Sequence, residues 1–426
     1  MSPSTIGERN RLRQLDRTAL AQHQVMRLNR LLTEILPTNP FYESKLSGRR
    51  LPLSSLEHLR DWPFTYKEEL LDSGSEYAAN HTNLSSSHAR FHQTSGTRGR
   101  PIIMLDTAAD WQWFVDTWQY VLDAAEVTAA DLALMAFSFG PFIGFWSANE
   151  ALVQRGCLVV PTGGMSTLAR LELLRVSRAT VICCTPSYAL HMLEVAGEHK
   201  MDVASLDVAK IIVAGEPGGS IPAIRQRIET GWQARLIDHA GATEIGPWGY
   251  GNREGTGLYI TESEFIAEFY SISTGKPASE GELSELVLTG LGRTGCPLIR
   301  YRTGDLVRPQ WSHAEQPDAE CRFVFLEGGL LGRTDDMMII RGVNIFPSSI
   351  EQIVRSFPEV VEYRLTVHRV AAMDQLSLEV EDRLENTARI EDELQLRLGL
   401  RVAVTLVPIG SLPRFDGKGK RFIDRR

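Results

Sequence analysis

The chain has 426 residues, of which 43% are hydrophobic and 23% charged, and this composition excludes low-complexity, collagen-like and disordered proteins. At roughly 100–200 residues per domain, it allows about two to four domains. A formal net charge of −8 argues against nucleic acid as the main partner. Five cysteines without paired spacing argue against a disulfide framework. Because neither a signal-peptide pattern nor an apolar run of about 20 residues is found, we expect a reduced, cytoplasmic protein that binds no membrane.

Two helical segments are predicted near the N-terminus. Apolar residues recur at helical spacing over residues 8–36, and Pro37 and Pro40 end the run, which predicts one long helix. The segment Trp62–Lys67 breaks the chain again and leads into a short helix that we expect Thr65 to cap.

The pattern of apolar runs and turns changes at two points in the middle of the chain. From residue 91, short apolar runs alternate with helical stretches of about ten to twenty residues, the pattern of βαβ units and a largely parallel, buried sheet. The expected strands are Leu132–Ala136, Cys157–Val160, Thr180–Cys184, Lys210–Ala214 and Ala234–Asp238. After residue 255, shorter segments with glycine turns predict an antiparallel sheet or a small β-barrel. These segments are Gly257–Ile260, Phe265–Tyr270, Glu285–Thr289, Leu298–Arg302 and Arg322–Leu326.

A separate alternation of helices and strands follows residues 332–336. Helices are expected at 348–356 and 387–398, and strands at 362–368, 376–381 and 402–406. We therefore predict an α/β protein in which residues 1–334 form a large N-terminal domain with βαβ sheet layers and a small β-barrel-like region. Residues 335–426 form a small, mobile α+β domain.

The segment Thr94–Pro101 has the composition of a phosphate-binding loop. It reads TSGTRGRP, and its glycines allow close backbone approach while hydroxyl and N–H groups can donate to phosphate oxygens. It lacks the spacing of a Walker loop. Taken alone, the segment fits either a phosphate site or an ordinary turn.

Further motifs follow predicted strands. Gly215–Gly219 (GEPGG), Asp238–Glu244 (DHAGATE) and Tyr301–Asp305 (YRTGD) lie where α/β sheets place their ligand loops. Glu244 offers a carboxylate suited to Mg²⁺, and Asp305 could accept hydrogen bonds from sugar hydroxyls. Gly332–Pro347 lies at the domain junction, and Leu412–Arg421 is a basic tail with Gly417 and Lys418. Each motif alone also fits a turn or a solvated tail.

In this order, these motifs resemble the adenylate-forming superfamily of acyl- and aryl-CoA ligases. Asn39–Tyr42, Trp62–Lys67 and Arg341–Pro347 are similar to the short phenylacetate–CoA ligase branch. The resemblance implies an AMP-forming acid–thiol ligase that uses ATP, Mg²⁺ and coenzyme A. A carboxylate attacks the α-phosphate of ATP, pyrophosphate leaves, and a thiol then attacks the acyl-adenylate.

The resemblance also implies roles for individual residues. Phosphate contacts are expected from Thr94, Ser95, Gly96, Thr97 and Gly99. Adenine and ribose contacts are expected from Gly215, Glu216, Pro217, Asp238, His239, Asp305 and Arg333. Catalytic roles fall to Thr243, to Glu244 as the Mg²⁺ ligand, and to Lys418 as the cation at the α-phosphate, with Lys420 as its alternative. Asp335 is the expected hinge, and Gly342 is expected in the thiol channel.

The acid is expected to bind among aromatic side chains. The expected contacts are Phe137, Phe139, Gly140, Pro141, Phe142, Gly241 and Ile245. Five aromatic residues between 137 and 146 suit a flat apolar acid such as an arylacetate or benzoate, although the same rings also fit a hydrophobic core. Because no acidic residue occurs there before Glu150, an amino-acid substrate is disfavoured.

Two residues depart from the family's pattern, Arg98 in the phosphate loop and Ala240 where a tyrosine usually stands. Residues 247–260 contain neither Cys nor His, so we expect no zinc there. Three alternatives remain open: transfer to CoA, transfer to a carrier-protein or other protein thiol, and a degenerate homologue that binds nucleotide without turnover. The sequence also allows a homodimer.

Overall fold

The computed structural model describes residues 4–71, 74, 76–82, 88–94, 101–315, 320–336, 338–340, 343–370, 373–413 and 421–425. Its first elements are helices α1 (Ile6–Arg13) and α2 (Arg17–Ile35). The prediction of one helix over residues 8–36 is therefore wrong. Asp16 starts a new helix because its carboxylate accepts a hydrogen bond from the Ala19 N–H at 2.8 Å.

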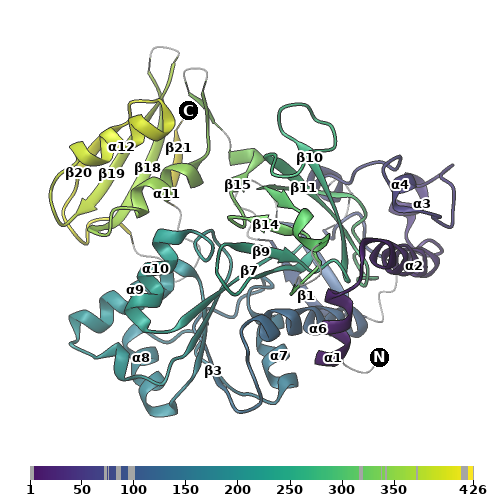
Figure 1. The fold of residues 1–426 in the computed structure, drawn as a ribbon, viewed down its shortest axis with the longest axis horizontal. Coiled ribbons are helices and arrows are strands. Elements are labelled where there is room, and N and C mark those ends of the chain that lie inside the picture. Colours follow the sequence, from purple (N-terminus) through teal and green to yellow (C-terminus); the bar gives the residue numbers. More distant parts are fainter. Residues whose placement is uncertain are drawn as a thin grey trace.

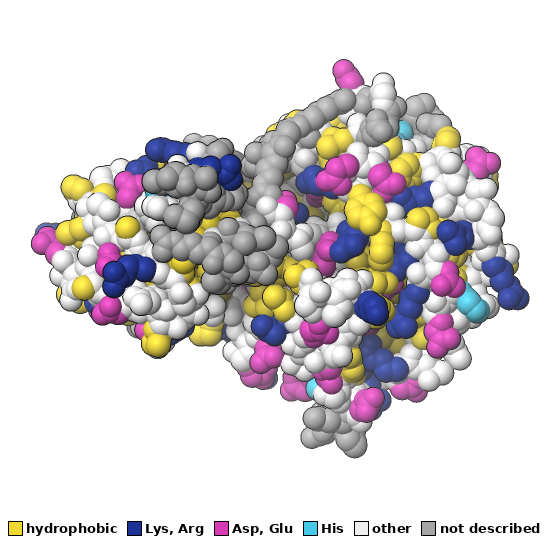
Figure 2. Space-filling view, turned by 90° about the horizontal axis from the view of Figure 1, so that it is seen from above, with side chains coloured by type: hydrophobic (Ala, Val, Ile, Leu, Met, Phe, Trp, Pro, Cys, Tyr) yellow, Lys and Arg dark blue, Asp and Glu magenta, His cyan; other side chains and the backbone are white. Residues whose placement is uncertain are grey.

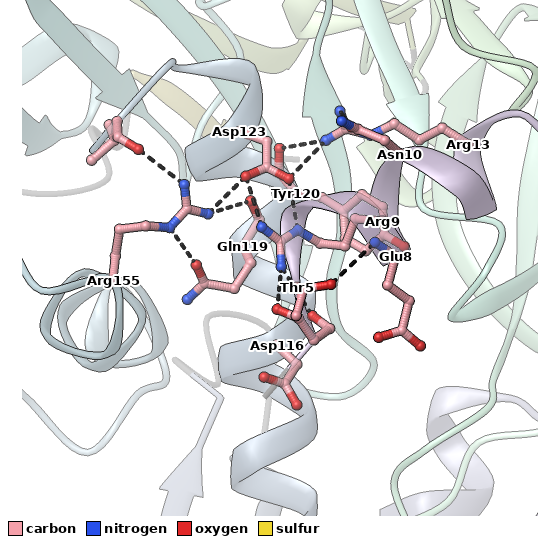
Figure 3. Close-up of polar contacts among 12 residues, drawn as sticks. Thr5, Glu8, Arg9, Asn10, Arg13, Asp116, Gln119, Tyr120, Asp123 and Arg155 are labelled. Carbon is pink, nitrogen blue, oxygen red and sulfur yellow. Dashed lines mark hydrogen bonds and ion pairs between the residues drawn. The ribbon is translucent and has the colours of Figure 1, made fainter. Parts of the chain in front are cut away.

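A buried carboxylate fixes α1 to the body of the protein (Figure 3). Asp123, at the end of α6 (Ala108–Ala124), accepts from Arg9 Nε at 2.6 Å and pairs with Arg13 and Arg155. These arginines belong to α1 and to α7 (Trp146–Arg155), so one side chain joins three helices. The side chains of Arg9 and Asp123 are each only 3% exposed.

Short helices follow, namely α3 (Pro40–Lys45), α4 (Leu56–Leu59) and α5 (Lys67–Leu71). The expected cap by Thr65 is wrong, because its hydroxyl instead donates to the Ile299 carbonyl at 2.7 Å. Glu69 accepts from the Tyr66 N–H at the start of α5. Thr65 therefore joins the segment before α5 to the residues that precede β12.

The expected phosphate loop connects two antiparallel strands, β1 (His88–Gln93) and β2 (Ile103–Thr107). A capping box between Thr107 and Asp110 then begins α6.

The central sheet has nine strands among the described residues, in the order β13-β14-β9-β8-β7-β6-β5-β3-β4 (Figure 1). Strands β4, β3, β5, β6 and β7 are parallel, as predicted, and the others pair antiparallel. The strands are β3 (Leu132–Met135), β4 (Leu158–Pro161), β5 (Val181–Cys184), β6 (Lys210–Val213), β7 (Arg235–Ala242), β8 (Gly246–Gly251), β9 (Gly257–Ile260), β13 (Pro309–Gln310) and β14 (Phe325–Glu327).

Two hydrophobic cores cover the two faces of the parallel strands. Helices α8 (Thr167–Ser177), α9 (Pro186–Glu198) and α10 (Pro222–Trp232) pack on one face, and α6 and α7 on the other. Alternate residues of one strand enter different cores, since Leu236 packs with α8–α10 and Ile237 with α6. Short 3₁₀ helices η1 (Val203–Ser205), η2 (Ser312–Glu315) and η3 (Thr334–Asp336) complete the connections.

A second, antiparallel sheet has the order β10-β11-β12-β15, which confirms the predicted antiparallel region. Its strands are β10 (Phe265–Ser271), β11 (Ser284–Gly290), β12 (Tyr301–Val307) and β15 (Gly332–Arg333). The strand expected at Leu298–Arg302 begins only at Tyr301. Arg300, with φ of 51°, adopts a left-handed conformation that interrupts extended backbone.

The C-terminal residues form a separate four-stranded sheet with its own hydrophobic core (Figure 1). Its order is β20-β19-β18-β21, and α11 and α12 pack on it. The elements are the hairpin β16 (Met338–Ile340) and β17 (Val343–Ile345), then α11 (Pro347–Arg355), β18 (Val360–Val370), β19 (Met373–Asp382), α12 (Ala388–Leu398), β20 (Ala403–Leu406) and β21 (Phe422–Arg425). Helix α11 contacts α10 of the larger part.

Figure 2 shows a large and a small lobe, with acidic and basic side chains interspersed on the visible face. All five cysteines are buried free thiols. Among the described helices, none is long and apolar enough to span a bilayer.

Candidate active site

The candidate site lies at the carboxyl end of the parallel strands. Because β6 and β7 are neighbours, with Val213 paired to Asp238, the segment Gly215–Pro217 follows β6 beside the point where β7 changes its partner from β6 to β8. The Ser187 N–H, which follows β5, donates to Glu216 Oε1 at 2.8 Å. The ends of β5 and β6 therefore meet β7 at the motifs predicted to bind the nucleotide.

Asp238 is buried beneath this edge. It accepts from the Ser220 hydroxyl at 2.6 Å and from the His239 N–H at 3.0 Å. A Cβ atom at Gly219 would lie 2.4 Å from the carboxyl carbon, so only glycine permits this approach. Burial raises the pKa of Asp238 to about 6.

Arg293 stabilises the turn that contains Thr243 and Glu244 through hydrogen bonds to its backbone. This arginine, 2% exposed, donates to the carbonyl oxygens of Thr243 and Glu244 at 3.1 and 2.6 Å and pairs with Asp106. The Glu244 carboxylate is buried and lies 2.9 Å from Lys67 Nζ. Glu244, the predicted Mg²⁺ ligand, is thus held in place through its backbone, and its carboxylate pairs with Lys67.

Asp305 and Arg333 form a pair at the junction of the two parts. Arg333 Nη1 lies 2.8 Å from Asp305 Oδ1, and its Nε lies 2.9 Å from Asp335 Oδ1. Gly304, with φ of 75°, lies within β12 where its pairing with β11 shifts register, a conformation that glycine adopts without strain. Burial raises the pKa of Tyr301, and the nearby charges of Glu244 and Asp305 raise it further. Tyr301 therefore connects the Glu244 and Asp305 regions, which lie 61 residues apart in the sequence by their numbering.

Some predicted residues lie outside the described part of the chain. These are Ser95, Gly96, Thr97, Gly99, Gly342 and Lys418. Of the expected phosphate loop, Thr94 is described, and its hydroxyl accepts from the Ile102 N–H at 3.0 Å across the base of the hairpin.

Phe137 and Phe139, two of the residues predicted to bind the acid, belong to a continuous series of rings. Ring centroids of Phe137 and Phe139 lie 4.4 Å apart, and Phe139 lies 4.5 Å from Trp146. Phe137 also contacts Phe145 at 5.0 Å, and Phe145 lies 6.2 Å from Trp118 of α6. We call Trp118, Phe137, Phe139, Phe145, Trp146 and His239 the aromatic cluster.

His239 forms the inner end of this cluster. Its ring centroid lies 4.2 Å from that of Trp118, and its Nδ1 lies 2.7 Å from the Gly249 carbonyl oxygen on β8. Burial lowers the pKa of His239 to about 4. The backbone of His239 remains beside the expected adenine loop, whereas its side chain faces the rings predicted to bind the acid.

The other predicted acid contacts differ in exposure. Gly241, Pro141 and Phe142 are exposed, and the Gly140 carbonyl accepts from Trp146 Nε1 at 3.0 Å. Ile245 is 2% exposed and lies in the core beside Trp113 and Gly290, so its part in acid binding stays a prediction.

Ala240, the residue that departs from the family's tyrosine, is buried against Gly249. Glu150, the first acid after the aromatic segment, pairs with Arg90 and accepts from Trp111. Among the residues that the structure describes, no three His, Cys, Asp or Glu side chains form a group that could hold a metal ion. The predicted absence of zinc stays a prediction.

Three residues of the site were not predicted from the sequence. Lys67 belongs to a segment singled out for its resemblance, but a lone lysine gives no sign that it faces Glu244. Arg293 and Trp118 lie in segments without a recognisable motif, and their roles depend on tertiary contacts.

A few contacts join the C-terminal part to the site. Arg421 binds Glu362 of its own sheet through two hydrogen bonds, at 2.7 and 3.0 Å. Its Nη1 also lies 3.8 Å from Glu216 Oε2. The Ser348 hydroxyl donates to the Leu331 carbonyl.

Comparison with known proteins agrees with this arrangement. A profile of the AMP-binding enzyme family matches residues 46–283, and one for the AMP-binding enzyme C-terminal domain matches residues 342–426. The chain is 31% identical to a phenylacetate-coenzyme A ligase of Thermus thermophilus, over 97% of this chain and 98% of that protein. It is 29% identical to a phenylacetate-coenzyme A ligase of Pseudomonas putida, over 96% and 94%.

Among solved structures, the chain is similar to 2-hydroxyisobutyryl-CoA ligase in the postadenylation state, bound to R3-HIB-AMP. The TM-score is 0.90 at 26% identity, covering 98% of this chain and 92% of that one. With the same enzyme in the thioesterification state, bound to 2-HIB-AMP and CoA, the TM-score is 0.73 at 27% identity, covering 99% and 94%. The chain as a whole thus superposes better on the postadenylation state.

Proposed function

Because the chain belongs to the AMP-binding enzyme family, we propose that it activates an aromatic carboxylic acid as an acyl-adenylate and transfers the acyl group to CoA. The supporting observation is that the nucleotide motifs meet at one sheet edge, with the aromatic cluster beside them. An AMP-forming acid–thiol ligase needs this proximity, because the carboxylate must attack the α-phosphate of bound ATP.

Each described residue can be given a part in this reaction. Asp305 accepts hydrogen bonds from the ribose hydroxyls, and Arg333, held between Asp305 and Asp335, lies close to the ribose and phosphates. The loop Gly215–Pro217 borders adenine. Glu244 would hold Mg²⁺, since carboxylate oxygen is its preferred protein ligand, and the bound ion would neutralise phosphate charge. Lys67 adds a second cation near the same carboxylate.

The transition state builds negative charge at the bridge between the α- and β-phosphates. A fixed cation placed there stabilises that charge more than it stabilises the bound substrates. We assign this role to Lys418, in the segment directly before Arg421. Residues 335–426 form the mobile domain in this proposal. Rotation about Asp335 then removes Lys418 after adenylation and brings Gly342 to the thiol.

The first prediction separates the two half-reactions. Lys418→Ala should lower acid-dependent ATP–pyrophosphate exchange by about 10²–10³-fold, because one preorganised donor to the transition state is lost. Conversion of a supplied acyl-adenylate and CoA to thioester should stay near the wild-type rate, because the proposed rotation has by then removed Lys418 from the site.

Lys420→Ala is the matched control and should leave exchange unchanged. If Lys420→Ala abolished exchange and Lys418→Ala did not, the assignment would be wrong by two residues. Using a carrier protein in place of CoA in the thioester assay tests the alternative thiol acceptor. Absence of exchange with a broad panel of acids would favour a degenerate homologue instead.

A further inference from the structure

The hydrogen bond at Nδ1 fixes the proton on the His239 ring. Its partner is the Gly249 carbonyl oxygen, at 2.7 Å, and a carbonyl oxygen can only accept. Nδ1 therefore carries the hydrogen. Burial keeps the ring neutral near pH 7, because it lowers the pKa of His239 to about 4. In a neutral imidazole with hydrogen on Nδ1, Nε2 is a hydrogen-bond acceptor.

Nε2 forms no hydrogen bond with any residue that the structure describes. It points toward Gly241, where a Cβ atom would lie 3.3 Å from it. Gly241 is exposed and carries no side chain, so no side chain of this residue covers Nε2. An acceptor of fixed tautomer thus faces the residue that was predicted to contact the acid.

Aromatic side chains line the other side of the His239 ring. The ring packs against Trp118, and Phe145 and Phe137 continue the cluster outward. An acid bound along these rings would meet the Nε2 acceptor at its inner end, and a hydrogen-bond donor on the acid would satisfy it. An acid without a donor would leave that atom unpaired when it displaces water.

We propose that His239 is a specificity-determining residue that selects acids bearing a hydroxyl group, which donates a hydrogen bond to Nε2. This inference rests on the proposed function, because it assigns the acid to the aromatic cluster. The structurally similar 2-hydroxyisobutyryl-CoA ligase was also solved in complex with 2-HIB-AMP, which agrees with this chemistry.

The experiment compares acids in matched pairs that differ by hydroxyl against methyl, which are similar in size. One pair is 2-hydroxyisobutyrate and pivalate, and others are the hydroxyphenylacetates and their methyl counterparts. The readout is kcat/KM in acid-dependent ATP–pyrophosphate exchange. At least one hydroxy acid should exceed its methyl partner by roughly 10- to 100-fold, the range that one buried hydrogen bond covers. Amino-substituted acids in the same panel distinguish an N–H donor from a hydroxyl.

The variant His239→Phe keeps a flat ring against Trp118 but removes the acceptor. It should bring the hydroxyl-to-methyl ratio close to one, because the hydroxy acids lose the hydrogen bond to Nε2 and the methyl acids have none to lose. His239→Gln, which restores an acceptor oxygen, should regain part of the ratio. A purely structural residue would lower both members of each pair equally.

Exchange without any hydroxyl preference in the wild type would overturn this inference and leave the proposed function intact. A preference that survives in His239→Phe would overturn it as well, as would an equal loss for both members of a pair. A wild-type protein that gives no exchange with any acid would overturn the proposed function, and this inference with it.

Discussion

Asp238 is a carboxyl group whose ionisation opposes folding. It lies beneath the nucleotide loops, accepts hydrogen bonds from Ser220 and His239, and has a pKa raised to about 6 by burial. The folded chain therefore binds a proton more tightly than the unfolded chain, in which an ordinary Asp titrates near 3.9. Between these two pKa values stability falls as pH rises, which is opposite to the behaviour of a salt-bridged carboxylate.

The variant Asp238→Asn cannot ionise and keeps the size of the side chain. Its free energy of unfolding, relative to wild type, should therefore increase by about 2–3 kcal/mol between pH 4 and pH 6 and stay constant above pH 7. Urea unfolding at a series of pH values measures this difference. A difference that does not change with pH would mean that Asp238 titrates normally in the folded protein.

Among the elements, the junction of α1, α6 and α7 depends on a single acidic side chain. Three arginines converge on Asp123 (Figure 3), and the closest of them, Arg9, is as deeply buried as the carboxylate. Removing one partner of a buried ion pair leaves the other charge without compensation.

Asp123→Ala should therefore lower the free energy of unfolding by about 3–5 kcal/mol. The matched control is Glu172→Ala, which removes the partner of Arg175 in an exposed pair and should change stability by less than about 0.5 kcal/mol. Urea unfolding monitored by tryptophan fluorescence checks both variants. Equal effects would show that the three-helix junction is not held by this carboxylate.

The sequence predicts elements well where local patterns determine them. The five parallel strands are confirmed within a few residues, because buried strands of a parallel sheet are short apolar runs between helices. The helix over residues 8–36 was wrong because the break depends on a single capping bond at Asp16. The shifted start of β12 depends on the conformation of Arg300, which buried contacts determine.

The residues of the site also divide into those that a local motif identifies and those that only tertiary contacts place. Glu244 and Asp305 could be singled out because they belong to motifs that occur in a recognisable order along the chain, and their roles stay predictions. Lys67, Arg293 and the side chain of His239 could not be placed, because their contacts join segments distant in sequence or lie on one particular face of a strand.

At the scale of the whole molecule, Arg421 connects the C-terminal sheet to the loop Gly215–Pro217, which is expected to border adenine. It pairs with Glu362 and lies 3.8 Å from Glu216, in a chain that superposes better on the postadenylation state of a similar ligase than on its thioesterification state. We therefore expect this contact to favour the adenylate-forming arrangement and to position the segment that contains Lys418.

Arg421→Gln should slow ATP–pyrophosphate exchange by about 10-fold, the factor that corresponds to about 1.4 kcal/mol of lost positioning. Thioester formation from a supplied acyl-adenylate should change less. Arg364→Gln is the control, because Arg364 pairs with Glu379 inside the same sheet. An equal loss in both half-reactions would indicate that Arg421 only stabilises its own domain.

The two partners of Arg421, Glu362 and Glu216, also affect how easily the C-terminal part can separate from the loop that contains Glu216. Glu362 lies in the same sheet, so Arg421 would keep this partner in the proposed rotation of residues 335–426 away from Glu216. That rotation would leave no buried arginine without a counter-charge, and at Arg421 it would break only the longer, 3.8 Å contact. Each additional 1.4 kcal/mol in that contact would lengthen the lifetime of the first arrangement about tenfold. A weak contact that can be remade in every cycle suits the proposed alternation of the C-terminal part between two arrangements.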